Sequence, residues 1–412
     1  MRSENHRANS LRIALFSGNY NYQRDGANMA LNRLVDFMER QGAEVLVFSP
    51  TSQEPAFEPA GTLVSVPSAP IPFRSEYRIA FGLPKRIRSQ IVDFKPNLIH
   101  LSAPDLLGRA ALRLSARLGV PAVASFHTRF DTYLRYYGLS MLEPAARGLM
   151  RSFYSNCEHV YAPSESVAQT LREQGWGRDV RLWSRGVDHT QFQPERRDMA
   201  WRRSMGIADT EVAVAFVGRL VLEKGLECFG RVVDTLRARG VAFRPLIVGD
   251  GPERQWMEER MPESAGAVFT GFLEGEDLAR AYASADVFFN PSKTETFGNV
   301  TLEAMASGLP TVCANATGSR SIVVDGETGY LVETSQANGY ADALQRLLQD
   351  ADLRAAMSAS ALVRSRDFGW DVVMLGLLAQ YEEVLARWRE EGRGDAARGA
   401  LARRSLARGW TS

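Results

Sequence analysis

The sequence is poor in the residues that build metal centres and disulfide frameworks. It has three cysteines and five histidines in 412 residues. Cys157, Cys228 and Cys313 are widely spaced, and the last two lie in apolar surroundings. This spacing matches neither a disulfide scaffold nor a zinc site. We therefore expect structural thiols in a reducing compartment.

Long apolar runs are also missing. The longest, such as VAVAFV at 212–217, have the length of a strand, whereas a membrane-spanning helix needs about 20 apolar residues. The N-terminal stretch MRSENHRANS is polar and lacks the apolar core of a signal peptide. These absences predict a cytoplasmic protein without a membrane-spanning segment.

The net charge of the chain is small, but its positive and negative residues are unevenly distributed. The net charge is +1, yet residues 1–190 carry 23 Lys and Arg against 17 Asp and Glu. The same counts are 21 against 30 for residues 191–391 and 5 against 1 for residues 392–412. A basic first half and a basic tail favour an anionic partner. No nucleic-acid-binding motif presents these arginines, so we expect no nucleic acid.

Short apolar runs alternate with helix-period segments along most of the chain, as is typical of βαβ units around parallel sheets. Two series of such runs predict two doubly wound α/β domains in tandem. We expect strands at 11–17, 43–49, 61–66, 97–102, 121–127, 159–164 and 180–186, and then at 212–218, 244–250, 267–272, 286–292, 310–315 and 329–334.

The domain boundary is expected in the polar stretch DHTQFQPERRD, residues 188–198. We assign an N-terminal Rossmann-like acceptor domain to 1–190 and a C-terminal Rossmann-like donor domain to 191–368. Residues 369–391 are expected to form C-terminal helices that pack back toward the N-terminal domain. The remaining 392–412 are Gly-, Ala- and Arg-rich, which predicts a basic flexible tail.

Two cations follow the predicted strand at 212–218, where open parallel sheets bind ligands. Arg219 and Lys224 lie in RLVLEKG, on a loop that enters a helix. Two cations beside a helix N-terminus suit a diphosphate. The alternative is a solvated loop without a ligand.

The segment SKTETFGNVTLEAMASG, residues 292–308, places Glu295 before a helix and Glu303 inside it. A phosphate at this helix N-terminus would meet the amides of Phe297, Gly298, Asn299 and Val300. A carboxylate beside a phosphate is repelled, so both glutamates suit sugar hydroxyls better. The alternative is a solvated helix face.

In the first domain, GNYNYQRDGANMALNRL leads from the first strand into a helix through Gly18 and Gly26. It allows a close phosphate approach but lacks the full G-x-G-x-x-G pattern. His127 closes the predicted strand at 121–127, where it is either a functional or a packed structural histidine.

A basic and aromatic segment, PFRSEYRIAFGLPKRIR, occupies residues 72–88 with five Lys and Arg against one Glu. At helical spacing this composition suits an anionic membrane surface. The alternative is an ordinary amphipathic helix packed on its own sheet.

The chain contains, in this order, the segments VGRLVLEKG, VGDGPER, FTGFLEGEDLARAYASADVFFNPSKTETFGNVTLEAMASGLP and GETGYLV. Together these segments resemble the motifs of the retaining family 4 glycosyltransferases of the GT-B fold. Glu295 and Glu303 match the E-x₇-E motif of that family. SFHTRFDTYLRYY and RLWSRGVD are similar to the branch with sulfoquinovosyldiacylglycerol synthases and glycolipid mannosyltransferases. The resemblance extends to about residue 390.

The resemblance implies two Rossmann-like domains with a cleft between them, and it assigns roles to single residues. Arg219 and Lys224 would hold the donor diphosphate without a metal. Glu295 would contact the donor sugar, beside the amides of Phe297 and Gly298.

The resemblance further implies that Glu303 holds the ribose hydroxyls and that the backbone near Phe272 and Leu273 reads the base. His127 would face the sugar from the opposite domain, and Gly26 would let a loop close over the phosphates. The chain departs from the family pattern in TGSRSIV, at Thr317, Gly318 and Ser321, where a Gly-Gly pair and an acidic residue are usual.

The expected activity is retaining, metal-independent transfer of a hexose from a UDP- or GDP-linked donor to a lipid at the cytoplasmic membrane face. Residues 72–88 and the basic tail would contact that membrane, and no cofactor is expected. Asp350 and Asp352 form a D-x-D, but in a helix-turn context. The alternatives are a soluble or polysaccharide-linked or lipopolysaccharide-linked acceptor and, more remotely, a non-catalytic nucleotide-sugar-binding protein.

Overall fold

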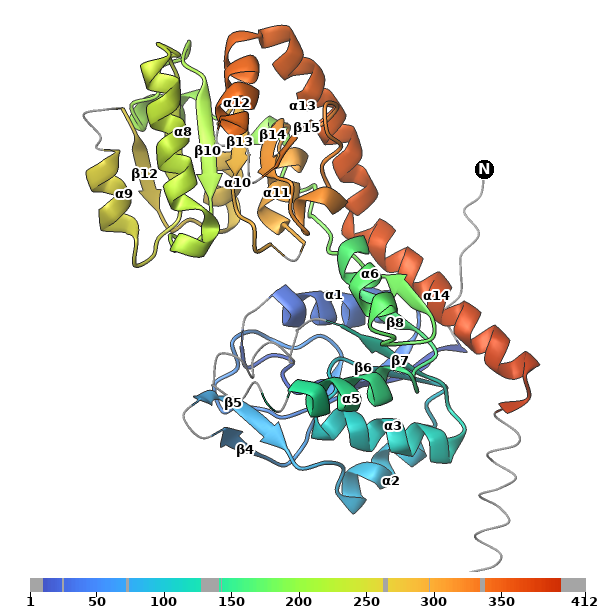
Figure 1. Ribbon diagram of the computed structural model, residues 1–412. Coiled ribbons are helices and arrows are strands. Elements are labelled where there is room, and N and C mark those ends of the chain that lie inside the picture. The colour runs from blue at the N-terminus through green and yellow to red at the C-terminus, as the bar shows by residue number, and fades with distance from the viewer. Residues whose placement is uncertain are drawn as a thin grey trace, which may run out of the picture. The chain divides into compact units, whose positions relative to one another are not determined.

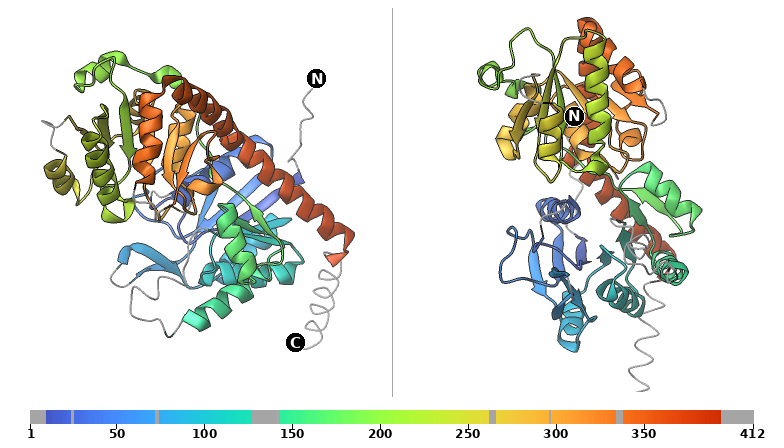
Figure 2. Two further views of the ribbon diagram at one scale, coloured as in Figure 1. Left: turned by 45° about the horizontal axis from the view of Figure 1, so that its top comes forward. Right: turned by 60° about the vertical axis from the view of Figure 1, so that its left-hand side comes forward.

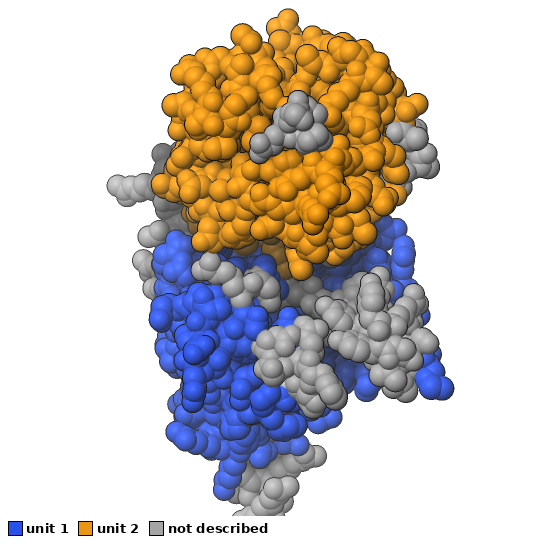
Figure 3. Space-filling view, turned by 90° about the vertical axis from the view of Figure 1, so that its left-hand side faces the viewer, with its two compact units in different colours: residues 1–183, 374–412 blue, residues 184–373 orange. Residues whose placement is uncertain are grey.

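The computed structural model describes residues 10–23, 26–71, 74–126, 141, 143–261, 266–295, 297–333 and 338–393 (Figure 1). The chain divides into two compact units, coloured separately in Figure 3. Unit 1 comprises residues 1–183 and 374–412, and unit 2 comprises residues 184–373. Each unit is built around its own parallel sheet.

Unit 1 contains a seven-stranded sheet in the order β3-β2-β1-β6-β7-β8-β9, in which all neighbours are parallel. Its helices α2, α3, α5 and α6 contribute apolar side chains to a core that also takes Ala14 and Phe16 from β1. The strands are β1 (Arg12–Phe16), β2 (Glu44–Ser49), β3 (Thr62–Ser65), β6 (Leu98–Leu101), β7 (Ala122–Ser125), β8 (Val160–Ala162) and β9 (Val180–Leu182), and the helices are α1 (Gly26–Arg40), α2 (Lys85–Phe94), α3 (Leu106–Leu118), α5 (Glu143–Tyr154) and α6 (Glu165–Glu173).

Unit 2 contains a six-stranded parallel sheet in the order β12-β11-β10-β13-β14-β15. Val214 and Phe216 of β10 share a core with α8, α9 and α12. Ala213 and Ala215 point to the opposite face, toward α10 and α11, so helices cover both faces (Figure 2). The strands are β10 (Ala213–Val217), β11 (Arg244–Val248), β12 (Val268–Gly271), β13 (Val287–Asn290), β14 (Thr311–Ala314) and β15 (Gly329–Val332), and the helices are α7 (Met199–Ser204), α8 (Leu226–Ala238), α9 (Arg254–Arg260), α10 (Gly275–Ala283), α11 (Asn299–Ala306), α12 (Gly339–Gln349) and α13 (Ala351–Ser365).

The prediction of two doubly wound α/β domains is confirmed, and every predicted strand is present with slightly different ends. The strands of these sheets were visible as apolar runs because parallel strands covered on both faces bury successive side chains. All five residues of β10 are buried, for example.

The long C-terminal helix α14 (Trp370–Glu390) belongs to unit 1 from residue 374 onward. The Tyr381 hydroxyl bonds to Nδ1 of His100 on β6, whose Nε2 lies 2.6 Å from Ser125 Oγ. Burial lowers the pKa of His100 to about 3, so this histidine is neutral at ordinary pH. The Arg181 guanidinium donates to Glu383 Oε1 at 2.7 Å. These contacts fix the last helix to the sheet formed by the first 183 residues.

The expectation of a helix over residues 72–88 is wrong. Residues 74–80 form β5 (Arg74–Ala80), which pairs antiparallel with β4 (Ser68–Ile71), and α2 begins only at Lys85. Gly82 has a φ of +108° and Pro84 precedes the helix, so both residues interrupt any helix across the segment. Arg78 donates from Nε to Ser68 Oγ at 2.9 Å, which fixes its side chain within the hairpin.

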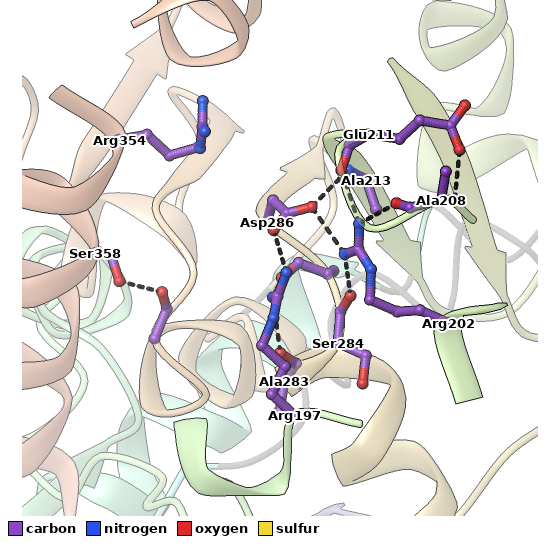
Figure 4. Close-up of polar contacts among 12 residues, drawn as sticks. Arg197, Arg202, Ala208, Glu211, Ala213, Ala283, Ser284, Asp286, Arg354 and Ser358 are labelled. Atoms are coloured by element: carbon purple, nitrogen blue, oxygen red, sulfur yellow. Dashed lines mark hydrogen bonds and ion pairs between the residues drawn. The ribbon is translucent and has the colours of Figure 1, made fainter. Parts of the chain in front are cut away.

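A buried arginine and a half-buried aspartate hold the amino ends of two strands in unit 2 together (Figure 4). Arg202 on α7 is fully buried and donates to Asp286 Oδ2 at 2.9 Å and to the Ser284 carbonyl at 2.6 Å. Asp286, directly before β13, also accepts from the Ala213 amide at the start of β10, at 2.7 Å. Removal of one partner of such a buried pair is strongly destabilising. This edge of the sheet is therefore structural, which leaves the carboxyl edge for ligands.

Within the described ranges no helix has the length and the apolar character needed to cross a bilayer. The three cysteines are free thiols; Cys157 and Cys313 are buried and Cys228 is half-buried.

Candidate functional site

The candidate site lies where the strand order of unit 2 reverses, between β10 and β13. The helices α8 and α11 that follow these two strands pack on opposite faces of the sheet. Doubly wound sheets bind ligands at the carboxyl ends of the strands at such a point. Arg219 and Lys224 follow β10, and Glu295 follows β13. The fold therefore brings together three residues that the sequence analysis selected.

Glycines let the loops at this edge pack backbone against backbone. A Cβ at Gly249 would lie 1.9 Å from the Gly218 carbonyl oxygen, and one at Gly251 would lie 2.4 Å from the Leu220 carbonyl oxygen. The Leu220 amide donates to the Asp250 carbonyl at 2.9 Å. The glycines of VGDGPER thus fix the loop that begins with Arg219.

Lys224 and Glu295 form an ion pair, with Nζ 2.6 Å from Oε1. Their side chains are 29% and 16% exposed, so neither residue is fully buried. Gly225, with a φ of +80°, brings the lysine loop against the loop after β13, because a Cβ there would lie 2.9 Å from the Pro291 carbonyl oxygen. Arg219 is exposed on the same loop as Lys224. The site thus combines cationic side chains with a carboxylate that one ligand could contact.

The N-terminus of α11 opens beside this pair. Gly298, with a φ of +91°, caps the helix, and Asn299 is its exposed first residue. Phe297 is buried against Phe368, with ring centroids 6.0 Å apart, and Val300 is half-buried. Amides at the start of a helix lack the carbonyl four residues earlier that would accept from them, so the amides of Asn299 and Val300 can bind an anion. The Thr301 amide donates to the Gly298 carbonyl at 3.0 Å.

The loop after β14 supports the same region. A Cβ at Gly318 would lie 2.8 Å from the Glu295 carbonyl oxygen and 2.9 Å from the carbonyl carbon of Phe297. Only a glycine fits this approach. The TGSRSIV loop, which departs from the family pattern, therefore packs on the backbone that carries Glu295.

Glu303 lies one turn further into α11, and the Tyr282 hydroxyl donates to its Oε2 at 3.0 Å. Glu303 is half-buried in the described part of the chain. Burial raises the pKa of Glu303 to about 7, and the hydrogen bond from Tyr282 opposes the rise. Sequence reasoning missed Tyr282, because a tyrosine within an amphipathic helix has no distinguishing pattern.

Phe272 and Leu273 follow β12 at the same edge of the sheet. Phe272 is 70% exposed, whereas Leu273 packs partly against the core of unit 2. An aromatic ring this exposed is available to a planar ligand.

The predicted residues of unit 1 are only partly described. His127 lies outside the described residues. Gly26 is the exposed first residue of α1. A Cβ at Gly18 would lie 2.4 Å from Asp105 Oδ2, so a side chain there would require the Asp105 carboxylate to shift.

The D-x-D segment begins α13. Asp350 is the N-cap and accepts from the Leu353 amide at 2.9 Å. In the part of the chain that the structure describes, no three His, Cys, Asp or Glu side chains are grouped so that they could hold a metal ion.

Two family profiles cover most of the chain. Residues 24–191 match the family described as Glycosyltransferase Family 4, and residues 211–350 match Glycosyl transferases group 1. A sucrose-phosphate synthase from Thermosynechococcus elongatus superposes with a TM-score of 0.71 at 21% identity, over 92% of this chain and 100% of its own. This similarity shows the fold.

Similar sequences include glycosyltransferases of bacteria and plants. A GDP-mannose-dependent alpha-mannosyltransferase of Mycolicibacterium smegmatis is 35% identical over 383 residues, which cover 92% of this chain and 98% of that protein. A sulfoquinovosyl transferase of Arabidopsis thaliana is 32% identical over 373 residues, 89% of this chain and 72% of its own. A phosphatidyl-myo-inositol mannosyltransferase of M. smegmatis is 29% identical over 364 residues, 87% of this chain and 90% of its own. The chain therefore belongs to the family 4 glycosyltransferases of the GT-B fold and is a hexosyltransferase.

Proposed function

We propose that this protein transfers a hexose, with retention of configuration, from a UDP- or GDP-linked donor to a lipid acceptor at the cytoplasmic face of a membrane. The observation that carries the proposal is the Lys224–Glu295 pair beside the N-terminus of α11. It combines a phosphate-binding group and a hydroxyl-binding group at the sheet edge where nucleotides bind.

The diphosphate is assigned to Arg219, Lys224 and the first-turn amides of α11. Departure of the nucleoside diphosphate leaves about two negative charges, which two cations and a helix N-terminus offset as they develop. These groups do not need a divalent cation to neutralise the leaving group, so we propose a metal-independent reaction.

The donor sugar is assigned to Glu295. A diphosphate competes with Glu295 for Lys224, and a carboxylate released from its cation can accept hydrogen bonds from sugar hydroxyls. In the transfer step, the bond between the anomeric carbon and the phosphate oxygen breaks. The acceptor hydroxyl oxygen bonds to the anomeric carbon from the same face, and its proton passes to the departing phosphate.

The nucleoside is assigned to Glu303 and to the backbone near Phe272 and Leu273. Glu303 Oε1 is assigned to the ribose hydroxyls, because Oε2 already accepts from the Tyr282 hydroxyl. The backbone near Phe272 and Leu273 is assigned to the base, with the exposed Phe272 ring beside it.

The lipid acceptor and the membrane contact rest on unit 1. Phe81 is 73% exposed, and Lys85, Arg86 and Arg88 in the first turn of α2 are exposed as well. Cations near an anionic membrane surface contribute about 1 kcal/mol each, and an aromatic side chain adds apolar insertion. A similar protein is named as a phosphatidyl-myo-inositol mannosyltransferase, which also favours a lipid acceptor.

The test begins with melting temperatures in the presence of UDP, GDP, ADP and their sugars, because a ligand that binds only the folded state raises the melting temperature. GDP-mannose is the first donor to examine, given the name of the M. smegmatis relative. We expect one nucleotide series to stabilise the protein and its sugar to be transferred to lipid in anionic vesicles. Absence of stabilisation by every nucleoside diphosphate would exclude the donor site, and transfer to soluble sugars alone would exclude the lipid acceptor.

A further inference from the structure

A buried tyrosine lies behind the carboxylate that we assign to the ribose. Tyr282 on α10 is fully buried, and its hydroxyl donates to Glu303 Oε2 at 3.0 Å. Both residues belong to unit 2, and none of the roles assigned to ligand-contacting groups uses Tyr282. The contact joins a residue that no ligand can touch to a residue in the candidate site.

The position of the Tyr282 hydroxyl is fixed by aromatic packing. Its ring lies edge-on to Phe192, with centroids 5.7 Å apart, and tilted against Phe288 at 6.0 Å. Such aromatic contacts add to the free energy gained from burial. Burial raises the pKa of Tyr282 well above its ordinary value, so the hydroxyl keeps its proton and acts as the donor.

The groups around Glu303 determine how strongly this hydrogen bond affects the protonation of its carboxylate. The titratable groups of described residues around α11 are Tyr282 from α10, Cys313 from β14 and Glu295 from the preceding loop. From α13, Ser358 donates to the Gly308 carbonyl at 2.5 Å. Lys224 is the cation of the neighbouring loop, and it is paired with Glu295 rather than with Glu303. The Tyr282 hydroxyl donates directly to Glu303, and this hydrogen bond opposes protonation of the carboxylate.

We propose that Tyr282 is a positioning residue for the nucleotide: it holds Glu303 Oε2, keeps the Glu303 side chain in one orientation and leaves Oε1 to accept the vicinal hydroxyls of the ribose. This inference rests on the proposed donor site. It extends that site to a residue in the core of unit 2 and assigns it an effect on nucleotide affinity.

Loss of the tyrosine hydroxyl has two consequences for a ribose. Glu303 loses a hydrogen bond to a charged group, which leaves its buried oxygen without a donor. More of the carboxyl is then protonated at neutral pH, and a protonated carboxyl accepts fewer hydrogen bonds. Both consequences weaken the binding of a nucleotide that has both ribose hydroxyls. The binding of a nucleotide without these hydroxyls is not affected.

The experiment measures dissociation constants by calorimetry between pH 5.5 and 8.5. The ligands are the nucleoside diphosphate that binds the wild type and its 2′,3′-dideoxy analogue. Wild-type affinity for the ribonucleotide is expected to fall as pH drops through about 7, following the ionisation of Glu303. In Tyr282→Phe the midpoint moves to higher pH, and affinity at pH 7.5 falls about tenfold. The dideoxy analogue binds both proteins equally.

A matched control is available in the same unit. Tyr340 on α12 is 3% exposed, and its hydroxyl has no hydrogen-bond partner among the described residues. Tyr340→Phe removes a comparable hydroxyl and is expected to leave both dissociation constants and the pH midpoint unchanged. Tyr282→Met, which also lacks the donor, replaces Tyr282→Phe if the latter does not fold.

Three outcomes would overturn the inference: an unmoved pH midpoint in the Tyr282 variant, an equal loss of affinity for the dideoxy analogue, or the same shift in Tyr340→Phe. Each would reduce Tyr282 to a structural residue while the wild type still binds nucleotide. A wild type that binds no nucleoside diphosphate at all would instead overturn the donor site itself.

Discussion

Lys224 Nζ and Glu295 Oε1 lie 2.6 Å apart although 71 positions separate the two residues along the chain. The loops after β10 and β13 bring them together at the carboxyl edge of the unit 2 sheet. Each side chain partly neutralises the other, so a change to one alters what the other can bind. The first two predictions follow from this dependence.

Glu295→Gln is expected to lower turnover about 10²- to 10³-fold, which is typical for the loss of one transition-state contact. Affinity for the free nucleoside diphosphate is expected to be retained or to increase, because Lys224 loses its competing carboxylate. Initial rates and calorimetry measure the two effects separately. A parallel loss of nucleotide affinity would contradict the assignment of Glu295 to the sugar.

Lys224→Ala is expected to weaken the binding of the nucleoside diphosphate as well as turnover, because its proposed ligand is the diphosphate. The nucleoside monophosphate should bind the variant and the wild type more nearly alike. Lys293→Ala is a matched control, since Lys293 is exposed and lies two residues before Glu295. An equal loss in both lysine variants would indicate general electrostatic attraction rather than a specific contact.

Metal removal is expected to leave transfer intact. The proposed charge compensation uses Arg219, Lys224 and the α11 N-terminus, so activity measured in excess EDTA should match activity in buffer with magnesium. Loss of transfer in EDTA, with recovery on addition of magnesium, would disprove the metal-independent mechanism.

Membrane binding is expected to depend on the first turn of α2. Arg86→Glu combined with Arg88→Glu should reduce co-sedimentation with anionic vesicles at low salt and reduce transfer to a vesicle lipid. Arg78 is unsuitable for this test because its side chain is bonded to Ser68 within the hairpin. Nucleotide affinity should not change, because the donor site lies in unit 2.

Arg113→Glu combined with Arg117→Glu on α3 supplies the control for a loss of basic charge, since both arginines are exposed in the same unit. The difference between the two double variants should shrink as salt rises and the Debye length falls to about 3 Å at 1 M. Equal vesicle binding by both variants at low salt would assign α2 an ordinary solvated face.

Glu303 is expected to reduce the stability of the nucleotide-free protein as pH rises. Burial raises the pKa of Glu303 from 4.5 to about 7, so the folded state disfavours the ionised form. The stability associated with the protonated carboxyl is present at low pH and is lost as pH rises through about 7. Glu303→Gln should therefore raise the melting temperature more at pH 8.5 than at pH 5.5. If the difference in melting temperature between Glu303→Gln and the wild type is the same at both pH values, the raised pKa of Glu303 is contradicted.

The strands and the loops with Arg219, Lys224 and Glu295 were predictable because each is marked by a pattern of neighbouring residues in the sequence. Buried parallel strands read as apolar runs, and ligand-binding residues follow them directly. The β4–β5 hairpin was not predictable in this way, because its basic and aromatic residues also fit a helical spacing. Gly82 and Pro84 are the residues that interrupt a helix there.

Other features depend on contacts that no local pattern records. Tyr282 meets Glu303 across 21 positions, and Arg202 meets Asp286 across 84. Each partner is an ordinary residue of its own helix or loop until the sheet is assembled. Their roles follow from tertiary packing, which overrides what either segment shows alone.

The contribution of α14 to unit 1 determines how this enzyme can be divided. A fragment ending at Trp183 would leave His100 without the Tyr381 hydroxyl and Arg181 without Glu383. It would also lose Leu377 and Leu378, which are buried in the intact chain. Independent folding of unit 1 is therefore expected to require residues 374–393, joined by an artificial linker or added as a separate peptide. Conversely, a stop codon early in α14 would damage the half of the protein that is synthesised first.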